Sequence, residues 1–245
     1  METLAAGAAA LGVPLGPEQL AAFARYRDEL LAWNARVNLT RIVAPAAVET
    51  HHFLDSLTGA TPLLARWGAA ASVLPLRCLD VGSGGGFPGV PLKLALPRLR
   101  MTLLEATGKK VEFLDHLIAA LGLSEVAAIA ERAETLAHAP AHRESYDVVF
   151  ARALAPLPVL LELTLPFLRV GGLLVAQRRG DLAEEIAGAA FACQTLGGGP
   201  PRIMPVTVPP LDDGRALVVV EKAAATPAAY PRRPGLPAKR PLAAR

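Results

Sequence analysis

The sequence predicts an α/β fold in which helices cover both faces of a mostly parallel sheet. From about residue 73 onwards, short apolar runs alternate with segments of helical periodicity. Parallel neighbours need a crossover connection, and the connecting helices bury their apolar stripes against the sheet. A glycine-rich turn follows the first apolar run, and an acidic residue ends the second. In such a doubly wound sheet the binding crevice lies at the carboxyl ends of the strands.

Two helical stretches precede this alternation. Residues 17–35 begin with a proline directly after Gly16, a favoured helix start, and carry apolar residues among charged ones. A second stretch, about 45–66, contains His51, His52 and Asp55. We expect residues 1–70 to form an N-terminal helical cap in which these three polar side chains pack and hydrogen-bond against the core. No third ligand is evident beside them, so no metal site is predicted.

The main domain is expected over residues 71–222. A helix is predicted over 109–121, where apolar residues recur at helical spacing and Gly122 supplies the stop. Lys109 and Lys110 at its start either contact phosphate or are simply solvated. The strands are predicted at six short apolar runs, which are 77–81, 100–105, 126–130, 146–151, 172–176 and 216–221.

The positive charge is concentrated at the C-terminus. Residues 1–222 hold 20 of the 25 Lys and Arg and all 22 Asp and Glu, a net charge of −2, whereas residues 223–245 hold five bases and no acid. The prolines of 223–245 predict an extended arm without helix. Alternating bases and prolines suit a segment laid along an RNA backbone, with Arg232 and Arg233 as candidate contacts. The alternative is a disordered, solubilising tail.

Other features exclude several classes of protein. Cys78 and Cys193 lie far apart in sequence, so neither a disulfide framework nor a metal-ligand spacing is present. The N-terminus has no basic region of the kind that begins a signal peptide, and charged residues and prolines interrupt each apolar stretch. We therefore expect a cytoplasmic protein with no membrane partner.

The most informative stretch runs from Leu79 to Gly89 and reads LDVGSGGGFPG. Glycines at a strand-to-helix turn let the backbone approach a ligand, and a carboxylate such as Glu105 at the end of the next strand can accept ribose hydroxyls. A register starting at Gly84 satisfies G-x-G-x-x-G, so an NAD-dependent oxidoreductase remains an alternative. The register starting at Gly82 lies directly after the strand and favours S-adenosylmethionine.

Several motifs in order resemble one family across nearly the whole chain. They are Asn38-Leu39-Thr40, HFLDSL at 52–57, the glycine stretch, GKKVEFL at 108–114, Arg132-Ala133-Glu134, Ala151-Arg152-Ala153, LVVVEK at 217–222 and YPRRPG at 230–235. On these residues the chain resembles the bacterial small-subunit rRNA guanine-N7 methyltransferases, the glucose-inhibited division protein B family. The resemblance implies a Rossmann-like class I methyltransferase with a seven-stranded sheet. Its expected partner is 16S rRNA or the small ribosomal subunit, and the protein is expected to be a monomer.

The resemblance also implies a set of residues that bind S-adenosyl-L-methionine. They are Gly82, Phe87, Glu105, Ala106, Thr107, Ala133, Glu134 and Arg152, and Gly84 of the glycine stretch is a further cofactor candidate. Phe87 would contact the cofactor or pack in the core. Arg152 is also a candidate for orienting substrate or cofactor, and the alternative is a structural ion pair. The family has a lysine after its fifth strand where this chain has Arg178 and Arg179, which are candidate RNA contacts.

Guanine N7 carries an unprotonated lone pair, so its methylation needs alignment in a water-poor site and no strong general base. The segment Ala151-Arg152-Ala153-Leu154-Ala155-Pro156 lacks the Asn or Asp-Pro-Pro-aromatic pattern expected of an exocyclic-amine methyltransferase. A pyrimidine C5 enzyme would need a cysteine nucleophile in the crevice, and neither cysteine is expected there. Besides the oxidoreductase, a non-catalytic RNA-binding or ribosome-assembly factor on the same scaffold is the other alternative.

Overall fold

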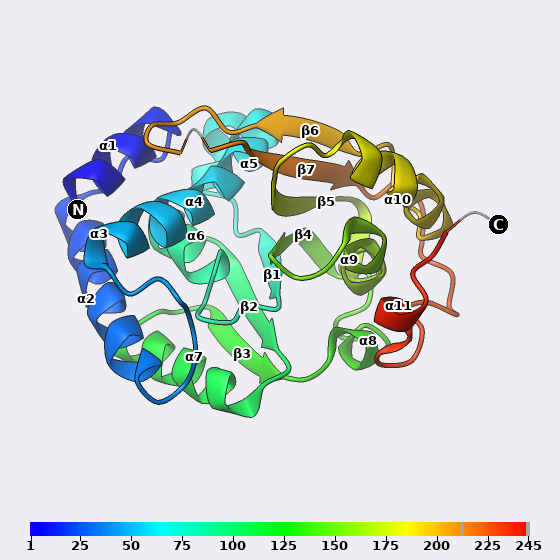
Figure 1. Ribbon diagram of the computed structural model, residues 1–245, viewed down its shortest axis with the longest axis horizontal. Helices are drawn as coiled ribbons and strands as arrows, with labels where there is room; N and C mark the ends of the chain where they lie inside the picture. Colours follow the sequence, from blue (N-terminus) through cyan, green and yellow to red (C-terminus); the bar gives the residue numbers. More distant parts are fainter. Residues whose placement is uncertain (212, 244–245) are drawn as a thin grey trace.

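The structure is a computed structural model, and it describes residues 1–211 and 213–243. Its centre is a seven-stranded sheet with strand order β3-β2-β1-β4-β5-β7-β6 (Figure 1). The five strands β1 to β5 are parallel, while β7 lies antiparallel between β5 and β6. The strands are β1 Arg77–Val81, β2 Arg100–Glu105, β3 Val126–Ala130, β4 Tyr146–Arg152, β5 Leu168–Arg179, β6 Arg202–Pro205 and β7 Arg215–Glu221. The predicted fold class is confirmed.

The strand order reverses at β1, which pairs with β2 on one side and with β4 on the other. Val81, the last residue of β1, lies opposite Leu104 of β2 and Ala151 of β4. The chain therefore leaves the sheet in opposite directions from neighbouring strands, which opens a crevice at their carboxyl ends. The glycine-rich stretch and Arg152 both lie at this edge.

The two faces of the sheet bury separate apolar cores, because successive strand residues point to opposite sides. Phe150 belongs to the core shared with the N-terminal helices, and its neighbours Val149 and Ala151 belong to the other core. The first core is covered by α1 Glu2–Ala10, α2 Pro17–Asn34, α3 Pro45–Val48, a π-helical turn Glu49–Leu54, α4 Asp55–Leu57, α5 Thr61–Trp67, α6 Gly89–Ala95 and α7 Gly108–Ala120. The second is covered by α8 Ala133–Leu136, α9 Leu157–Thr164 and α10 Ala183–Thr195.

The C-terminal arm is more ordered than its prolines predict. Residues 223–243 run along α9 and α8 and include a one-turn helix, α11 Leu236–Lys239 (Figure 1). Gly235 reverses the chain at a φ of +79°, and Pro237 lies in the first turn of α11, where a missing N–H costs nothing. Leu242 then packs into the second core. The expectation of an arm without helix is therefore wrong at α11, and Arg245 lies outside the described residues.

The division into a cap, a main domain and an arm stays a prediction. Buried residues of α1 and α2 share one core with α7 and the sheet. Within residues 1–211 and 213–243, no helix is long and apolar enough to cross a membrane.

Candidate active site

The glycine-rich stretch turns sharply as it leaves β1. The N–H groups of Gly82 and Ser83 both donate to the carbonyl oxygen of Leu104, at 2.8 and 3.1 Å. Gly82 has a φ of +76°, and a Cβ there would lie 2.6 Å from the Leu154 Cδ1 atom. Only glycine fits this turn without displacing Leu154. The tight turn keeps the backbone at the crevice.

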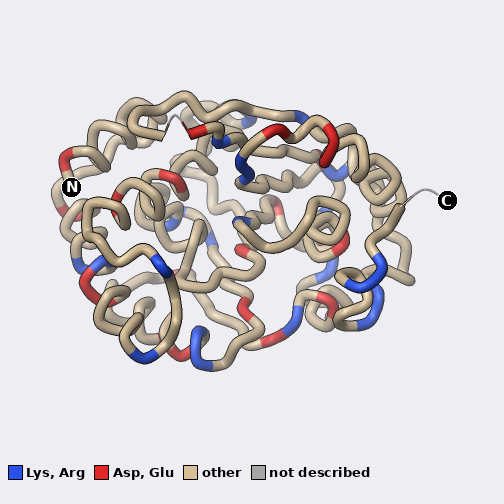
Figure 2. Tube along the Cα trace, viewed as in Figure 1, with Lys and Arg blue, Asp and Glu red and all other residues tan. Residues whose placement is uncertain are grey.

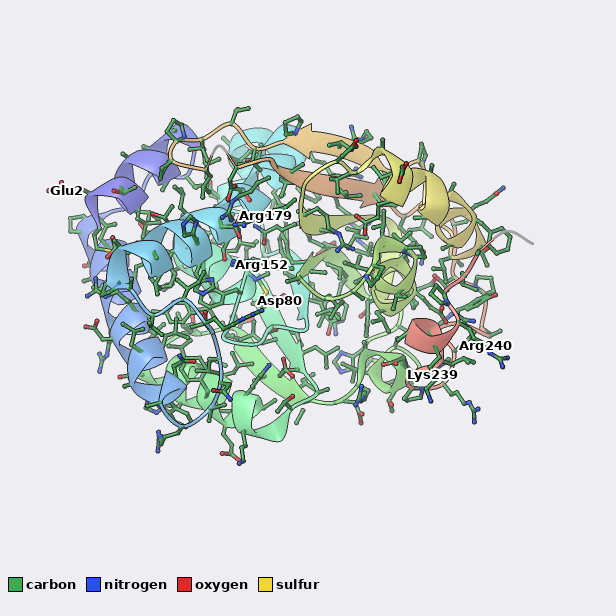
Figure 3. The ribbon with its side chains drawn as sticks, viewed as in Figure 1. Glu2, Asp80, Arg152, Arg179, Lys239 and Arg240 are labelled. Atoms are coloured by element: carbon green, nitrogen blue, oxygen red, sulfur yellow. The ribbon has the colours of Figure 1, made fainter. Side chains whose placement is uncertain are left out.

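Asp80 lies in the central strand β1, two residues before Gly82, and is fully buried; its position is labelled in Figure 3. Its Oδ2 atom accepts a hydrogen bond of 2.9 Å from the N–H of Gly89, and Oδ1 has no partner. Burial raises the pKa of Asp80 to about 7, against the hydrogen bond from Gly89. Asp80 therefore holds the far end of the glycine stretch from beneath.

Glu105 ends β2 beside the glycine turn. Its Oε2 atom accepts the Gly84 N–H at 3.0 Å, and its Oε1 atom accepts the Thr107 N–H at 2.9 Å. Each carboxylate oxygen keeps a second lone pair for a ligand hydroxyl. Gly84 and Thr107, two of the predicted cofactor residues, thus fix the Glu105 carboxylate, and their part in binding cofactor stays a prediction.

A cleft of about 350 Å³ opens at this point, and we call it the cofactor cleft. Five of the predicted cofactor residues line it, namely Gly82, Glu105, Ala106, Ala133 and Glu134. Its other lining residues are Val81, Leu104, Glu131, Arg132, Ala153, Leu154, Ala155, Val159, Leu163, Gly235 and Ala238. Apolar walls with a few convergent polar groups fit the nucleoside part of S-adenosylmethionine, whose ribose needs acceptors such as Glu105.

Phe87 packs in the core instead of lining this cleft. Its ring stacks on Tyr26 at 5.5 Å between centroids and on His52 at 4.4 Å. Phe87 therefore faces the N-terminal helices, which agrees with the alternative that it packs in the core. A role for Phe87 in binding cofactor stays a prediction.

Arg152, at the end of β4, links the sheet to the N-terminal helices. Its Nε atom lies 3.0 Å from Asp55 Oδ2, and its Nη2 atom donates to the His51 carbonyl oxygen at 2.6 Å. Nη2 also donates to His52 Nδ1 at 3.1 Å. The ion-pair alternative is thus realised, and the expected packing of His51, His52 and Asp55 against the core is confirmed. Asp55 also pairs with Arg215 of β7.

His52 is held as a neutral ring in this network. Because a guanidinium can only donate, Nδ1 of His52 must accept from Arg152, and the proton resides on Nε2, which donates to Thr40 Oγ1 at 2.6 Å. Burial, with Arg152 nearby, lowers the pKa of His52 to about 3. The imidazole therefore positions Arg152 without adding charge.

A second cleft, of about 530 Å³, shares the residue Ala153 with the cofactor cleft, and we call it the arginine cleft. Its lining residues are Arg41, Ile42, Asp55, Arg152, Ala153, Gln177, Arg178, Arg179 and Glu185. Figure 3 shows Arg152 and Arg179 in the same part of the molecule, above Asp80. Ala153 lines both clefts and has a φ of +50°, unusual for a residue with a side chain. The cofactor and arginine clefts therefore adjoin at Ala153.

Comparison with known proteins decides the family. A model of the family described as rRNA small subunit methyltransferase G matches residues 19–207. The chain belongs to this family. Ribosomal RNA small subunit methyltransferase G of Roseiflexus sp. strain RS-1 is 48% identical over 242 residues, which are 99% of this chain and 100% of the relative. The protein of that name from Dehalococcoides mccartyi strain CBDB1 is 46% identical over the same shares.

The family predicted from the sequence motifs is thereby confirmed. This family member is a methyltransferase, and its cofactor is S-adenosylmethionine. Among solved structures, a predicted O-methyltransferase from Agrobacterium tumefaciens aligns with a TM-score of 0.51 and 20% identity. That alignment covers 62% of this chain and 76% of the other, and it shows the shared fold.

The two arginines after β5 have different surroundings in this methyltransferase. Arg178 donates from Nη2 to the Ala155 carbonyl oxygen at 2.6 Å and lies 3.5 Å from Glu185. Arg179 pairs with Asp213 at 3.2 Å, and its side chain is 56% exposed. Arg179 is therefore the more accessible of the two to a phosphate in the arginine cleft.

The two predicted RNA contacts of the arm also differ. Arg232 donates to the buried carboxylate of Glu162, with Nη2 at 2.6 Å from Oε2. Arg233 is exposed and, with Lys239, borders a shallow hollow at α11. Figure 2 shows Lys and Arg gathered in this segment. Arg232 thus anchors the arm, whereas Arg233 faces solvent.

Sequence reasoning missed several residues of the arginine cleft. Arg41 directly follows the Asn38-Leu39-Thr40 motif, and this adjacency was the only sequence signal that could have indicated it as a site residue. Gln177 directly precedes the predicted Arg178, and that position was its only signal. In the structure it lies in β5 with 7% of its surface exposed and donates to Thr58 Oγ1 at 3.0 Å. Within the described residues, no group of three or more His, Cys, Asp or Glu side chains could hold a metal ion.

Proposed function

We propose that the protein transfers the methyl group of S-adenosylmethionine to N7 of a guanine in 16S rRNA, acting in the cytoplasm as a monomer. The observation that carries the proposal is the meeting of two unlike clefts at Ala153 in a member of this family. One cleft has the walls and carboxylates of a nucleoside site, and the other is rich in arginines. A cofactor and a nucleotide can therefore approach each other inside one chain.

The cofactor cleft holds S-adenosylmethionine through groups already oriented in the protein. Glu105 accepts ribose hydroxyls, Glu134 and Ala133 border the adenine, and the Gly82 turn lets the backbone approach the ligand. When bound, the cofactor supplies a methyl group on a positively charged sulfur. The apolar Leu154, which lines the cleft between Ala153 and Ala155, helps to exclude water from the space between the two clefts.

The arginine cleft orients the RNA. Arg41 and Arg179 neutralise phosphates near the target nucleotide, and Arg152 borders the space where the base enters. Guanine N7 has a free lone pair, so no proton has to be removed before methyl transfer and no metal is required. The residues on either side of Ala153 in the chain are Arg152 and Leu154, neither of which is a base at neutral pH. This composition suits a nitrogen that is already nucleophilic.

The test is a methylation map of 16S rRNA in a strain that lacks the gene. We expect one guanine-N7 mark to be lost, then restored by the wild-type gene and by Gly108→Ala but not by Gly82→Asp. Gly108 is the matched control, because a Cβ there meets nothing within 4 Å, whereas one at Gly82 meets Leu154. For purified Gly82→Asp, we expect S-adenosylmethionine to bind at least about 100-fold more weakly, which corresponds to about 2.7 kcal/mol.

Three results would contradict the proposal. An unchanged methylation map would exclude the rRNA reaction. Binding of rRNA without turnover of labelled S-adenosylmethionine, on naked rRNA and on small subunits, would favour the non-catalytic assembly factor. Tight binding of NAD in place of S-adenosylmethionine would favour the oxidoreductase.

A further inference from the structure

The C-terminal arm forms part of the cofactor cleft. Gly235 and Ala238 line this cleft together with Glu134 of α8. In Figure 1, α11 lies next to α8 and α9, although more than 70 positions separate it from both in the sequence. The C-terminal arm, which the sequence predicts to be an extended arm or a disordered tail, therefore borders the cleft through Gly235 and Ala238.

The arm is anchored beside the cleft by a buried ion pair. Glu162 of α9 is fully buried, and its carboxylate accepts the Arg232 backbone N–H at 2.8 Å. The Arg232 side chain adds Nε at 2.8 Å from Oε1 and Nη2 at 2.6 Å from Oε2. Val159 and Leu163, on the same helix, line the cofactor cleft. The pair therefore fixes the arm directly against a wall of the cleft.

A second contact reaches the cleft itself. The Gly235 N–H donates to Glu134 Oε1 at 2.9 Å. Glu134 is 7% exposed, and within the described residues its carboxylate has no other hydrogen bond and no ion pair. The turn at Gly235 thus sets the direction of an acidic side chain that borders the ligand space.

Contacts upstream keep the whole arm in place. Arg143 donates to the carbonyl oxygens of Thr226 at 2.8 Å and Tyr230 at 2.9 Å, and His138 lies 2.8 Å from the Pro231 oxygen. These are backbone acceptors, so they hold the path of the chain rather than one side chain. The arm is docked from its first residues to α11.

We propose that the C-terminal arm is a structural wall of the cofactor site. In this proposal Arg232 and Glu162 are the positioning pair that holds the arm against the cleft. This proposal rests on the proposed function, because it takes the cofactor cleft to be the S-adenosylmethionine site. It assigns Arg232 to cofactor binding through arm placement, in place of contact with RNA. The exposed cations on the outer side of the arm remain free for a nucleic acid.

The first test enlarges the wall without disturbing its anchors. Ala238→Leu adds a side chain at the cleft, and Ala229→Leu makes the same change at an exposed position of the arm outside the cleft. Calorimetric titration of the full chain with S-adenosylmethionine and S-adenosylhomocysteine should show at least tenfold weaker binding for Ala238→Leu and binding within twofold of wild type for Ala229→Leu. Equal affinities of Ala238→Leu and wild type would overturn the proposal.

The second test releases the anchor. Arg232→Gln should weaken both ligands about tenfold, whereas Arg240→Gln, which removes an exposed arm charge at α11, should stay within twofold of wild type. Thermal unfolding checks that each variant is folded. Should Arg232→Gln fail to fold, Arg232→Gln with Glu162→Gln removes both charges and takes its place. A folded variant with wild-type affinity would count against the positioning pair.

The two proposals fail in different ways. If wild type binds neither ligand, the proposed function fails. If wild type binds both and the Ala238 and Arg232 variants bind equally well, only the role of the arm fails.

Discussion

The two clefts that meet at Ala153 are built on different principles. The cofactor cleft is shaped by backbone, with a glycine turn at Gly82 and a carboxylate, Glu105, fixed by two backbone N–H groups. The arginine cleft is shaped by side chains from separate segments, which Asp55 joins by pairing with Arg152 and Arg215. The first arrangement suits one constant ligand, whereas the second suits a polyanion that binds by charge. Changes in the two clefts should therefore affect different measurements.

The largest expected effect tests whether Arg152 serves the arginine cleft or the cofactor cleft. Arg152→Lys keeps the charge but loses the planar fork that reaches Asp55, His51 and His52 together. We expect kcat/KM for rRNA to fall about 100-fold, about 2.7 kcal/mol, because the base would no longer be oriented. The dissociation constant of S-adenosylmethionine should stay within threefold of wild type.

Arg169→Lys is the matched control for this change. Arg169 pairs with Asp147 at the surface with 49% of its side chain exposed, so both measurements should remain at wild-type values. A tenfold weaker cofactor affinity in Arg152→Lys, with rRNA turnover preserved at saturating cofactor, would instead place Arg152 in the cofactor cleft.

The same contrast explains how much of the site the sequence could predict. Gly82 and Glu105 follow directly on apolar strands, so local pattern and fold geometry suffice to bring them together. His52 and Arg152 are 100 positions apart, and Arg232 and Glu162 are 70 apart. No local pattern names such partners, because the pairing exists only after the helices and the arm have packed. For the same reason the prolines of the arm correctly signal an irregular chain but do not show that it docks.

An intermediate effect contrasts two buried titratable groups, His52 and Asp80. The pKa of His52 is lowered to about 3, so between about pH 3 and 6.5 the unfolded chain binds the proton and the free energy of unfolding rises with pH. The pKa of Asp80 is raised to about 7, so between about pH 4 and 7 the folded chain holds the proton and the free energy of unfolding falls with pH. In wild type the two contributions oppose each other.

Removing either group should expose the contribution of the other. Between pH 4.5 and 6, Asp80→Asn should make the change in the free energy of unfolding more positive than in wild type by about 2 kcal/mol in total. The expected difference is about 1.4 kcal/mol per proton and pH unit. His52→Asn should shift the same change in the opposite direction by about 2 kcal/mol. Urea unfolding at several pH values measures both, and parallel profiles of the two variants and wild type would show that neither group titrates differently on folding.

The smallest expected effect concerns the exposed rim of the arginine cleft. Arg179→Gln removes one accessible cation, and we expect rRNA affinity to fall about three- to fivefold near 0.1 M salt, with the salt slope reduced by about 1. Arg25→Gln removes the same charge from an exposed position on α2 and should change neither quantity. Because a phosphate contact releases counterions, affinity and slope must change together. A loss of affinity with an unchanged slope would mean that Arg179 contacts the base or holds Asp213 in place, and the arginine cleft would then recognise the RNA by shape rather than by charge.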